Sequence, residues 1–150
     1  MDKVVELEKL KKEIEGDKSL PLMQSSLVFG EGDPNCKILF IGEAAGRNEA
    51  IQRKPFVGLA GKVVDRNLEA IGIPRSEVYI SNVVKCRPPD NRDPSPEEIA
   101  AYAPYLDKEI EILDPVLIVT LGRFSMGKFI PDVKISQVHG HLHKVQFKGK

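Results

Sequence analysis

Residues 37–61 read KILFIGEAAGRNEAIQRKPFVGLAG, and this stretch decides the fold. It opens on a short apolar run at residues 38–41, which predicts a buried strand, and then breaks sharply at the turn 42–46. A buried strand that leads into a glycine-bounded turn is how open α/β sheets form ligand sites at the carboxyl ends of their strands. Gly42 and Gly46 let the backbone approach a ligand closely, because neither carries a Cβ atom.

The flanking segments alternate between helical and strand patterns. Three segments show the apolar spacing of helices, at residues 2–16, 58–71 and 96–113. Ser95 and Glu98 form a capping-box pattern at the start of the third one. Two further apolar runs predict buried strands, at residues 78–84 and 116–121, and the second is followed by a short helix to about residue 130. Residues 135–147 alternate in character and predict a hairpin.

This order of strand, helix, strand, helix and strand predicts an α/β fold with a parallel sheet and right-handed crossovers. The carboxyl ends of parallel strands meet at one edge of such a sheet. We therefore expect Gly42, Glu43, Asn82 and Gly122 to lie along a single edge.

Length and composition fit one ordinary globular domain over residues 1–150, and we expect a monomer. Hydrophobic residues make up 41% of the chain and charged residues 29%. No apolar run approaches the roughly 20 residues of a membrane helix, and the charged first residues do not resemble a secretory signal. Two cysteines are too few for a disulfide framework, which favours a cytoplasmic setting.

The net charge is zero, which argues weakly against a large nucleic-acid footprint. Positive charge is nevertheless concentrated in two places. Residues 121–150 carry a net charge of +5, and a second basic group follows the strand 78–84: Lys85, Arg87 and Arg92. We predict that this second group contacts DNA phosphates, although a solvated basic surface would have the same pattern.

Three side chains near the strand ends are candidates for chemistry. Glu43 directly follows the first glycine of the turn, where a carboxylate would point into a cleft, but a lone glutamate there is often only solvated. Phe56 is flanked by Pro55 and Gly58 in a polar stretch of sequence, which suits stacking on a planar base better than core packing. Asn82 interrupts an apolar strand, so its amide either bonds nearby backbone or offers a donor and an acceptor to a heterocycle.

The turn itself is neither a P-loop nor a dinucleotide-binding glycine pattern. His139, His141 and His143 would share one face of a strand and could bind a metal. No carboxylate or cysteine cluster stands near them, so we favour an exposed strand face and predict no metal site.

The motifs taken together resemble a known family. GEAAGRNEA, KPFVGLAGK, VYISNVVKCRPPDNRDPSPEE and VLIVTLGR occur in this order, and VFGEGDPNCKILFIGE precedes them. This combination resembles the family 4 uracil-DNA glycosylases over roughly residues 27–140. The resemblance implies a three-layer α/β/α fold with a central parallel sheet, and a reaction that cleaves the bond between uracil and deoxyribose in DNA for base-excision repair.

The resemblance also implies a role for each candidate residue. Glu43 would orient or activate the hydrolytic water, and Asn91 would assist at the catalytic centre. Phe56 would stack on the flipped uracil, and Asn82 would bond its pyrimidine edge. The remaining pocket residues would come from the first motif, which would line the pocket and hold the water: Gly42, Ala44 and Gly46.

The sequence departs from the family at the iron–sulfur cluster, which uses four cysteines. Cys86 matches one ligand, Tyr102 stands at the second, and the other two, expected near Glu15 and Lys18, are absent. Cys36 is not at a ligand position, so we predict that no cluster is present. The first motif also departs from the family, with Ala45 in place of proline and Ala50 in place of an acid.

A further departure concerns the carboxyl end, where the family continues into another strand and a His-Pro motif. Neither occurs within these 150 residues. Loss of that donor to the leaving uracil would cost roughly 3–4 kcal/mol of transition-state stabilisation. The sequence therefore leaves three readings open. They are a glycosylase, an impaired relative that binds DNA or a nucleobase without cleavage, and a nucleotide-binding α/β module.

Overall fold

The computed structural model describes residues 1–150, and its centre is a four-stranded sheet in the order β1-β3-β2-β4. The strands are β1 (Glu31–Gly32), β2 (Ile38–Ala44), β3 (Tyr79–Val84) and β4 (Leu117–Thr120). β2 runs parallel to both β3 and β4, as predicted. The sheet is nevertheless mixed rather than wholly parallel, because the two-residue β1 pairs with β3 in the antiparallel direction.

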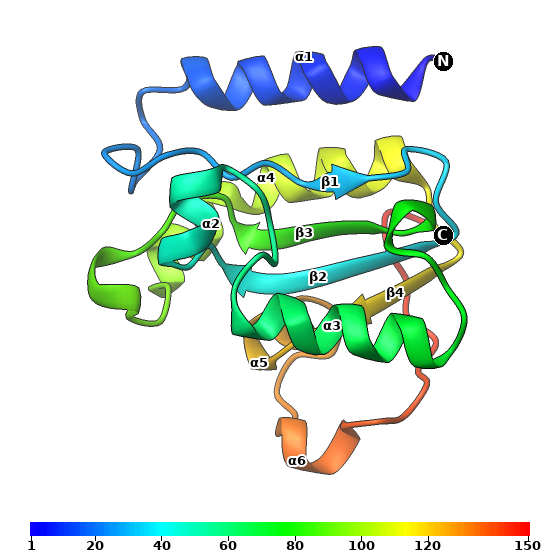
Figure 1. Cartoon of the computed structure of the whole chain (residues 1–150). Helices are drawn as coiled ribbons and strands as arrows, with labels where there is room; N and C mark the ends of the chain where they lie inside the picture. Colours follow the sequence, from blue (N-terminus) through cyan, green and yellow to red (C-terminus); the bar gives the residue numbers. More distant parts are fainter.

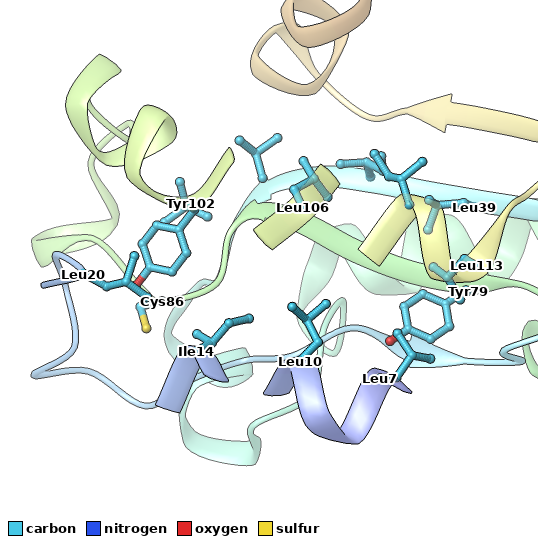
Figure 2. Packing of buried hydrophobic residues seen from close by; sticks show 14 of the residues in the cluster. Leu7, Leu10, Ile14, Leu20, Leu39, Tyr79, Cys86, Tyr102, Leu106 and Leu113 are labelled. Atoms are coloured by element: carbon cyan, nitrogen blue, oxygen red, sulfur yellow. The ribbon is translucent and has the colours of Figure 1, made fainter. Parts of the chain in front are cut away.

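Helices cover both faces of this sheet (Figure 1). α4 (Pro96–Leu113) packs against β3, and α1 (Lys3–Gly16) packs against α4. Leu10 of α1, Leu106 of α4 and Leu39 of β2 meet in the larger core cluster (Figure 2). On the opposite face α3 (Leu59–Ala70) forms a smaller cluster with alternate residues of the strands. This arrangement matches the expected layers of helix, sheet and helix, since strand side chains alternate between the two faces.

The start of α4 follows the predicted capping box. The backbone nitrogen of Glu98 donates to Ser95 Oγ at 3.2 Å, and the backbone nitrogen of Ser95 donates to Glu98 Oε1 at 2.8 Å. Two backbone donors that the helix itself leaves unpaired are thereby satisfied. The cap fixes where the long loop after β3 ends.

Several predicted features differ from the structure. The short helix α2 (Arg47–Gln52) was not predicted, and two single turns also occur, η1 (Arg75–Glu77) and η2 (Pro89–Asn91). β4 was expected to be buried but is an edge strand, with Leu117 38% exposed. The hairpin predicted for residues 135–147 is wrong. After α5 (Arg123–Phe129) the chain forms the short helix α6 (Ile135–Val138) and then lacks regular structure.

None of the helices combines the length and the apolar character that crossing a membrane requires.

Candidate functional site

The carboxyl ends of the parallel strands meet at one edge, as predicted. Gly42 of β2 stands opposite Asn82 of β3 in the parallel register. The backbone nitrogen of Leu121, just after β4, donates to the carbonyl of Ile41 at 2.8 Å and brings Gly122 to the same edge. The backbone therefore assembles three loops from distant parts of the sequence around the turn after β2.

Phe56 and Asn82 converge on Gly42. A Cβ atom at Gly42 would lie 2.4 Å from Cζ of Phe56 and 2.5 Å from Oδ1 of Asn82. No real Cβ atom tolerates such distances, so the glycine is what allows the ring and the amide to approach the backbone of β2. The aromatic ring, the amide and the bare backbone of Gly42 thus form one compact group, which we call the Gly42 cluster.

The Asn82 side chain is largely enclosed but has no hydrogen-bond partner in the chain. Asn82 is only 3% exposed, and its backbone carbonyl accepts a hydrogen bond from Lys85 Nζ at 3.0 Å. Its amide makes no hydrogen bond within the chain, and the only fully enclosed side-chain polar atom without a partner is Oε2 of Glu109. The Asn82 amide therefore keeps contact with solvent and can offer both a donor and an acceptor.

Phe56 is half-buried, with its ring partly packed against the smaller core cluster. Its backbone has a φ of 51°, in the left-handed region that bulky residues seldom adopt. Arg75 donates to the carbonyl oxygens of Pro55 and Phe56, at 2.7 and 2.9 Å. Sequence reasoning missed Arg75, because nothing in its surroundings at η1 distinguishes it from a surface arginine.

Glu43 lies beside the loop after β4. A Cβ atom at Gly122 would lie 2.6 Å from Glu43 Oε1, so the carboxylate occupies the space that this glycine leaves open. Gly122 has a φ of 101°, which also favours glycine. Burial raises the pKa of the Glu43 carboxyl, the negative charge of Asp93 raises it further, and the positive charge of Arg123 opposes both. Asp93 and Arg123 form a solvent-exposed ion pair of 2.5 Å with each other.

The first motif holds a second carboxylate that sequence reasoning missed. Glu49 of α2 accepts a 3.4 Å hydrogen bond from the backbone nitrogen of Gly58, and a Cβ atom at Gly46 would lie 3.0 Å from its Oε2. The side chain therefore links the turn after β2 to the start of α3. Ala44, predicted to line the pocket, packs its methyl group against the larger core cluster, so only its backbone can face the turn.

No hydrogen bond or ion pair joins Asn91 to the Gly42 cluster. It lies in η2 with a φ of 55° and is exposed, and its Oδ1 accepts a 2.6 Å hydrogen bond from Arg87 Nε. The predicted catalytic role of Asn91 and the predicted DNA contact of Arg87 therefore concern side chains that bind each other in this structure. Asp93, two residues later, is the part of this loop that acts electrostatically on Glu43.

The predicted DNA contact of Lys85 is wrong. Its side chain is completely buried and forms a 2.5 Å ion pair with Glu109, which is also completely buried. The same ammonium group donates to Ser81 Oγ and to the carbonyl of Asn82. Residues 81, 83 and 85 point to the same face of the sheet, where α4 lies, so the strand's alternation directs this lysine inward.

Arg92 has a structural partner, although nearly half of its side chain is exposed. Its two terminal nitrogens donate to both oxygens of Glu98, at 2.7 and 2.9 Å. This pairing is the main reason that the pKa of Glu98 is lowered to about 2. Arg92 therefore fixes the start of α4, and its role as a phosphate contact stays a prediction.

A large cavity lies elsewhere, between β4 and residues 138–148. Its walls combine apolar side chains with the irregular end of the chain, and the titratable groups among them include two exposed ion pairs, Lys148 with Glu111 and Lys150 with Asp114. His139, His141 and His143 are exposed there, and nowhere do three or more metal-ligating side chains gather. We place the functional site at the Gly42 cluster because polar and aromatic groups converge there without being bonded to each other.

The region of Cys86 has a donor set that does not fit an iron–sulfur cluster. The Cys86 thiol is buried and contacts Met23 Sδ at 3.8 Å. The Tyr102 hydroxyl donates to the carbonyl of Pro21 at 2.8 Å, and Leu20 packs beside them (Figure 2). Burial raises the pKa of the Cys86 thiol. One protonated thiol among apolar side chains cannot replace four thiolates.

Comparisons with known proteins identify the family of this chain. The family model of the uracil DNA glycosylase superfamily matches residues 29–147. Type-4 uracil-DNA glycosylases from three organisms are similar, namely those of Sulfurisphaera tokodaii (51% identical over 96% of this chain), Archaeoglobus fulgidus (44% over 85%) and Thermotoga maritima (45% over 78%). The chain spans 69%, 66% and 61% of the length of these relatives. Since the family match covers most of the chain, the protein belongs to the uracil DNA glycosylase superfamily and is type-4-like within it.

Proposed function

We propose that this protein is a uracil-DNA glycosylase, which hydrolyses the N-glycosidic bond of a uracil turned out of the DNA. The observation that supports this best is the convergence of Phe56 and the unbonded Asn82 amide on Gly42. A planar ring beside a free donor and acceptor suits one pyrimidine. The relatives named above are called uracil-DNA glycosylases, and this chain shares their family.

The proposed reaction assigns a task to each part of the site. The base must first leave the stack, which costs a few kcal/mol and costs least for a mispaired base. Phe56 then stacks on the uracil ring, and the Asn82 amide pairs with O4 and N3–H. Cytosine presents a donor where uracil presents O4, so it would leave a buried group unpaired and be rejected.

Glu43 is proposed to position the water that attacks C1′ of the sugar. Water adds its oxygen to C1′ as the bond from C1′ to N1 breaks, and the electron pair of that bond leaves with the uracil anion. Because the carboxylate form is the one that accepts a proton from water, a raised pKa of Glu43 limits activity on the acidic side. The backbone of residues 42–46 lines the path of the water.

The experiment is release of free uracil from a single-stranded oligonucleotide that contains one uracil. We expect release by the parent chain and its loss in Glu43→Ala and Asn82→Ala variants. Binding of the oligonucleotide without release would favour the second function, an impaired relative that binds DNA or a nucleobase without cleavage.

We also propose that the protein binds no iron–sulfur cluster, because Cys86 is the single thiol in the region and Tyr102 bonds backbone there. Iron content and visible absorption of protein purified without air test this, and stoichiometric iron would refute it. We further propose that the protein is a monomer, that it works in the cytoplasm, and that its partner is uracil-containing DNA. The elution volume from a size-exclusion column tests whether it is a monomer.

A further inference from the structure

The backbone at Phe56 adopts a conformation that needs outside support. A bulky residue with a φ of 51° is disfavoured, because its Cβ atom crowds the neighbouring carbonyl oxygen. Such conformations persist only where surrounding contacts hold them, and they gather at sites that clamp a ligand. The position of the Phe56 ring over Gly42 depends on whatever holds this backbone.

Arg75 supplies that support from another part of the chain. Its Nη2 donates to the carbonyl of Pro55 at 2.7 Å and its Nη1 donates to the carbonyl of Phe56 at 2.9 Å. The planar guanidinium group is rigid, so bonding two successive carbonyls fixes the orientation of the peptide between them. The Phe56 carbonyl is confined from the other side as well, since a Cβ atom at Gly61 would lie only 1.9 Å from its oxygen.

Asp65 of α3 completes the contact by accepting from Arg75 Nη1 at 2.8 Å. The two side chains are 33% and 51% exposed, so this ion pair is screened by solvent and adds little by itself. The two carbonyl contacts, which lie inward of it, are therefore what matters for the loop.

The location of Arg75 in η1 gives the contact its importance. η1 leads directly into β3, the strand that carries Asn82. One guanidinium group thus connects the loop of the aromatic ring to the strand of the amide. We propose that Arg75 is a positioning residue that fixes Phe56 relative to Asn82 and so sets the width of the pyrimidine slot. The part of this inference that concerns uracil rests on the proposed function.

The ring position can be measured in the ligand-free protein by fluorine NMR. Replacing the six phenylalanines with 4-fluorophenylalanine gives one signal each, and Phe56→Tyr identifies the signal of residue 56. We expect Arg75→Ala and Arg75→Lys to move and broaden this signal while the other five stay in place. Arg75→Lys should not hold the ring in place either, because a single ammonium group does not form the rigid contact with both carbonyl oxygens. Millimolar guanidinium ion should partly restore the signal in Arg75→Ala.

Arg66→Ala is the matched control, because Arg66 lies exposed on the same helix as Asp65. We expect it to leave the signal of residue 56 unchanged. An unchanged signal in Arg75→Ala would overturn the inference whatever the protein does. A Tm measurement on each variant verifies that the comparison is made between folded proteins.

The functional consequence is read from the affinity for 5-fluorouracil. We expect Arg75→Ala to weaken binding about tenfold, the effect of losing one base–aromatic stack. Full affinity in a variant whose ring has moved would refute the positioning role. If the parent chain itself binds no 5-fluorouracil, the proposed function fails, while the signal of residue 56 still decides whether Arg75 holds the ring.

Discussion

Replacing Lys85 with methionine tests whether this lysine is part of the core rather than of a DNA-binding surface. Lys85 and Glu109 are both completely buried and form a 2.5 Å ion pair. Glu109 Oε2 already lacks a partner, and without Lys85 the carboxylate would keep only the Ser81 hydroxyl, at 2.6 Å. Removing one member of a buried pair costs about 3–5 kcal/mol, because the other charge is left unpaired in the interior.

That loss is a large share of the stability of a domain, which is about 5–15 kcal/mol in all. At a urea dependence of about 2 kcal/mol per molar, the midpoint of unfolding should fall by roughly 2 M. The assay is urea unfolding followed by circular dichroism at pH 7. The double variant Lys85→Met with Glu109→Leu should recover most of the loss, since two apolar side chains of similar size replace the pair.

Two results would refute this reasoning. One is a loss below about 1 kcal/mol in Lys85→Met, the range of an exposed ion pair. The other is a folded variant whose DNA affinity has become less dependent on salt, with a slope reduced by about one, which would mark a lost phosphate contact. Equal losses in the single and double variants would show that Glu109 is not the partner on which stability depends.

Three other predictions concern the cap, the carboxylate and the ring. Glu98→Gln should cost about 1–2 kcal/mol at pH 7, since Arg92 is half exposed and solvent screens the pair. The folded pKa of Glu98, about 2, lies below the unfolded value. The parent therefore has this stability in full above about pH 4.5 and loses it as the pH falls through about 2. The unfolding free energies of the parent and of Glu98→Gln should accordingly become equal near pH 2. Glu43→Gln should raise the Tm at neutral pH, because the raised pKa marks a carboxylate that is costly to ionise in the fold, while abolishing uracil release. An unchanged or lower Tm would contradict that. Gly61→Ala, despite the helix preference for alanine, should displace the Phe56 carbonyl and abolish 5-fluorouracil binding, and full binding would show that the loop tolerates the shift.

The fold and the centre of the site follow from local patterns. The strand runs and the parallel-sheet rule place Gly42 opposite Asn82, and the structure has that pairing. The capping box at Ser95 is equally local, since it needs only the cap residue and the residue three positions later. Phe56 was recognised because a phenylalanine flanked by Pro55 and Gly58, in an otherwise polar stretch, is unusual in a core.

The errors concern contacts that are distant in sequence. Lys85 was read as a surface charge because its partner, Glu109, lies 24 residues away on the apolar face of α4. An acid on that face was the signal available, since it stands between Leu106 and Ile110. Arg75 gave no signal at all, because its partners are backbone carbonyls 19 and 20 residues earlier. Residues 135–147 have the alternation of polar and apolar side chains that is typical of strands. A hairpin also needs a second strand to pair with, and alternation alone does not supply one.

Titrating the isotope-labelled chain with free uracil tests the central claim most directly. The claim is that the Asn82 amide and the Phe56 ring together recognise one pyrimidine over Gly42. We predict a saturable shift of the Asn82 side-chain amide signal together with the ring signals of Phe56, and no such shift with cytosine. Shifts confined to residues 138–148, beside the cavity at β4, or an Asn82 amide that does not respond to uracil, would contradict the claim.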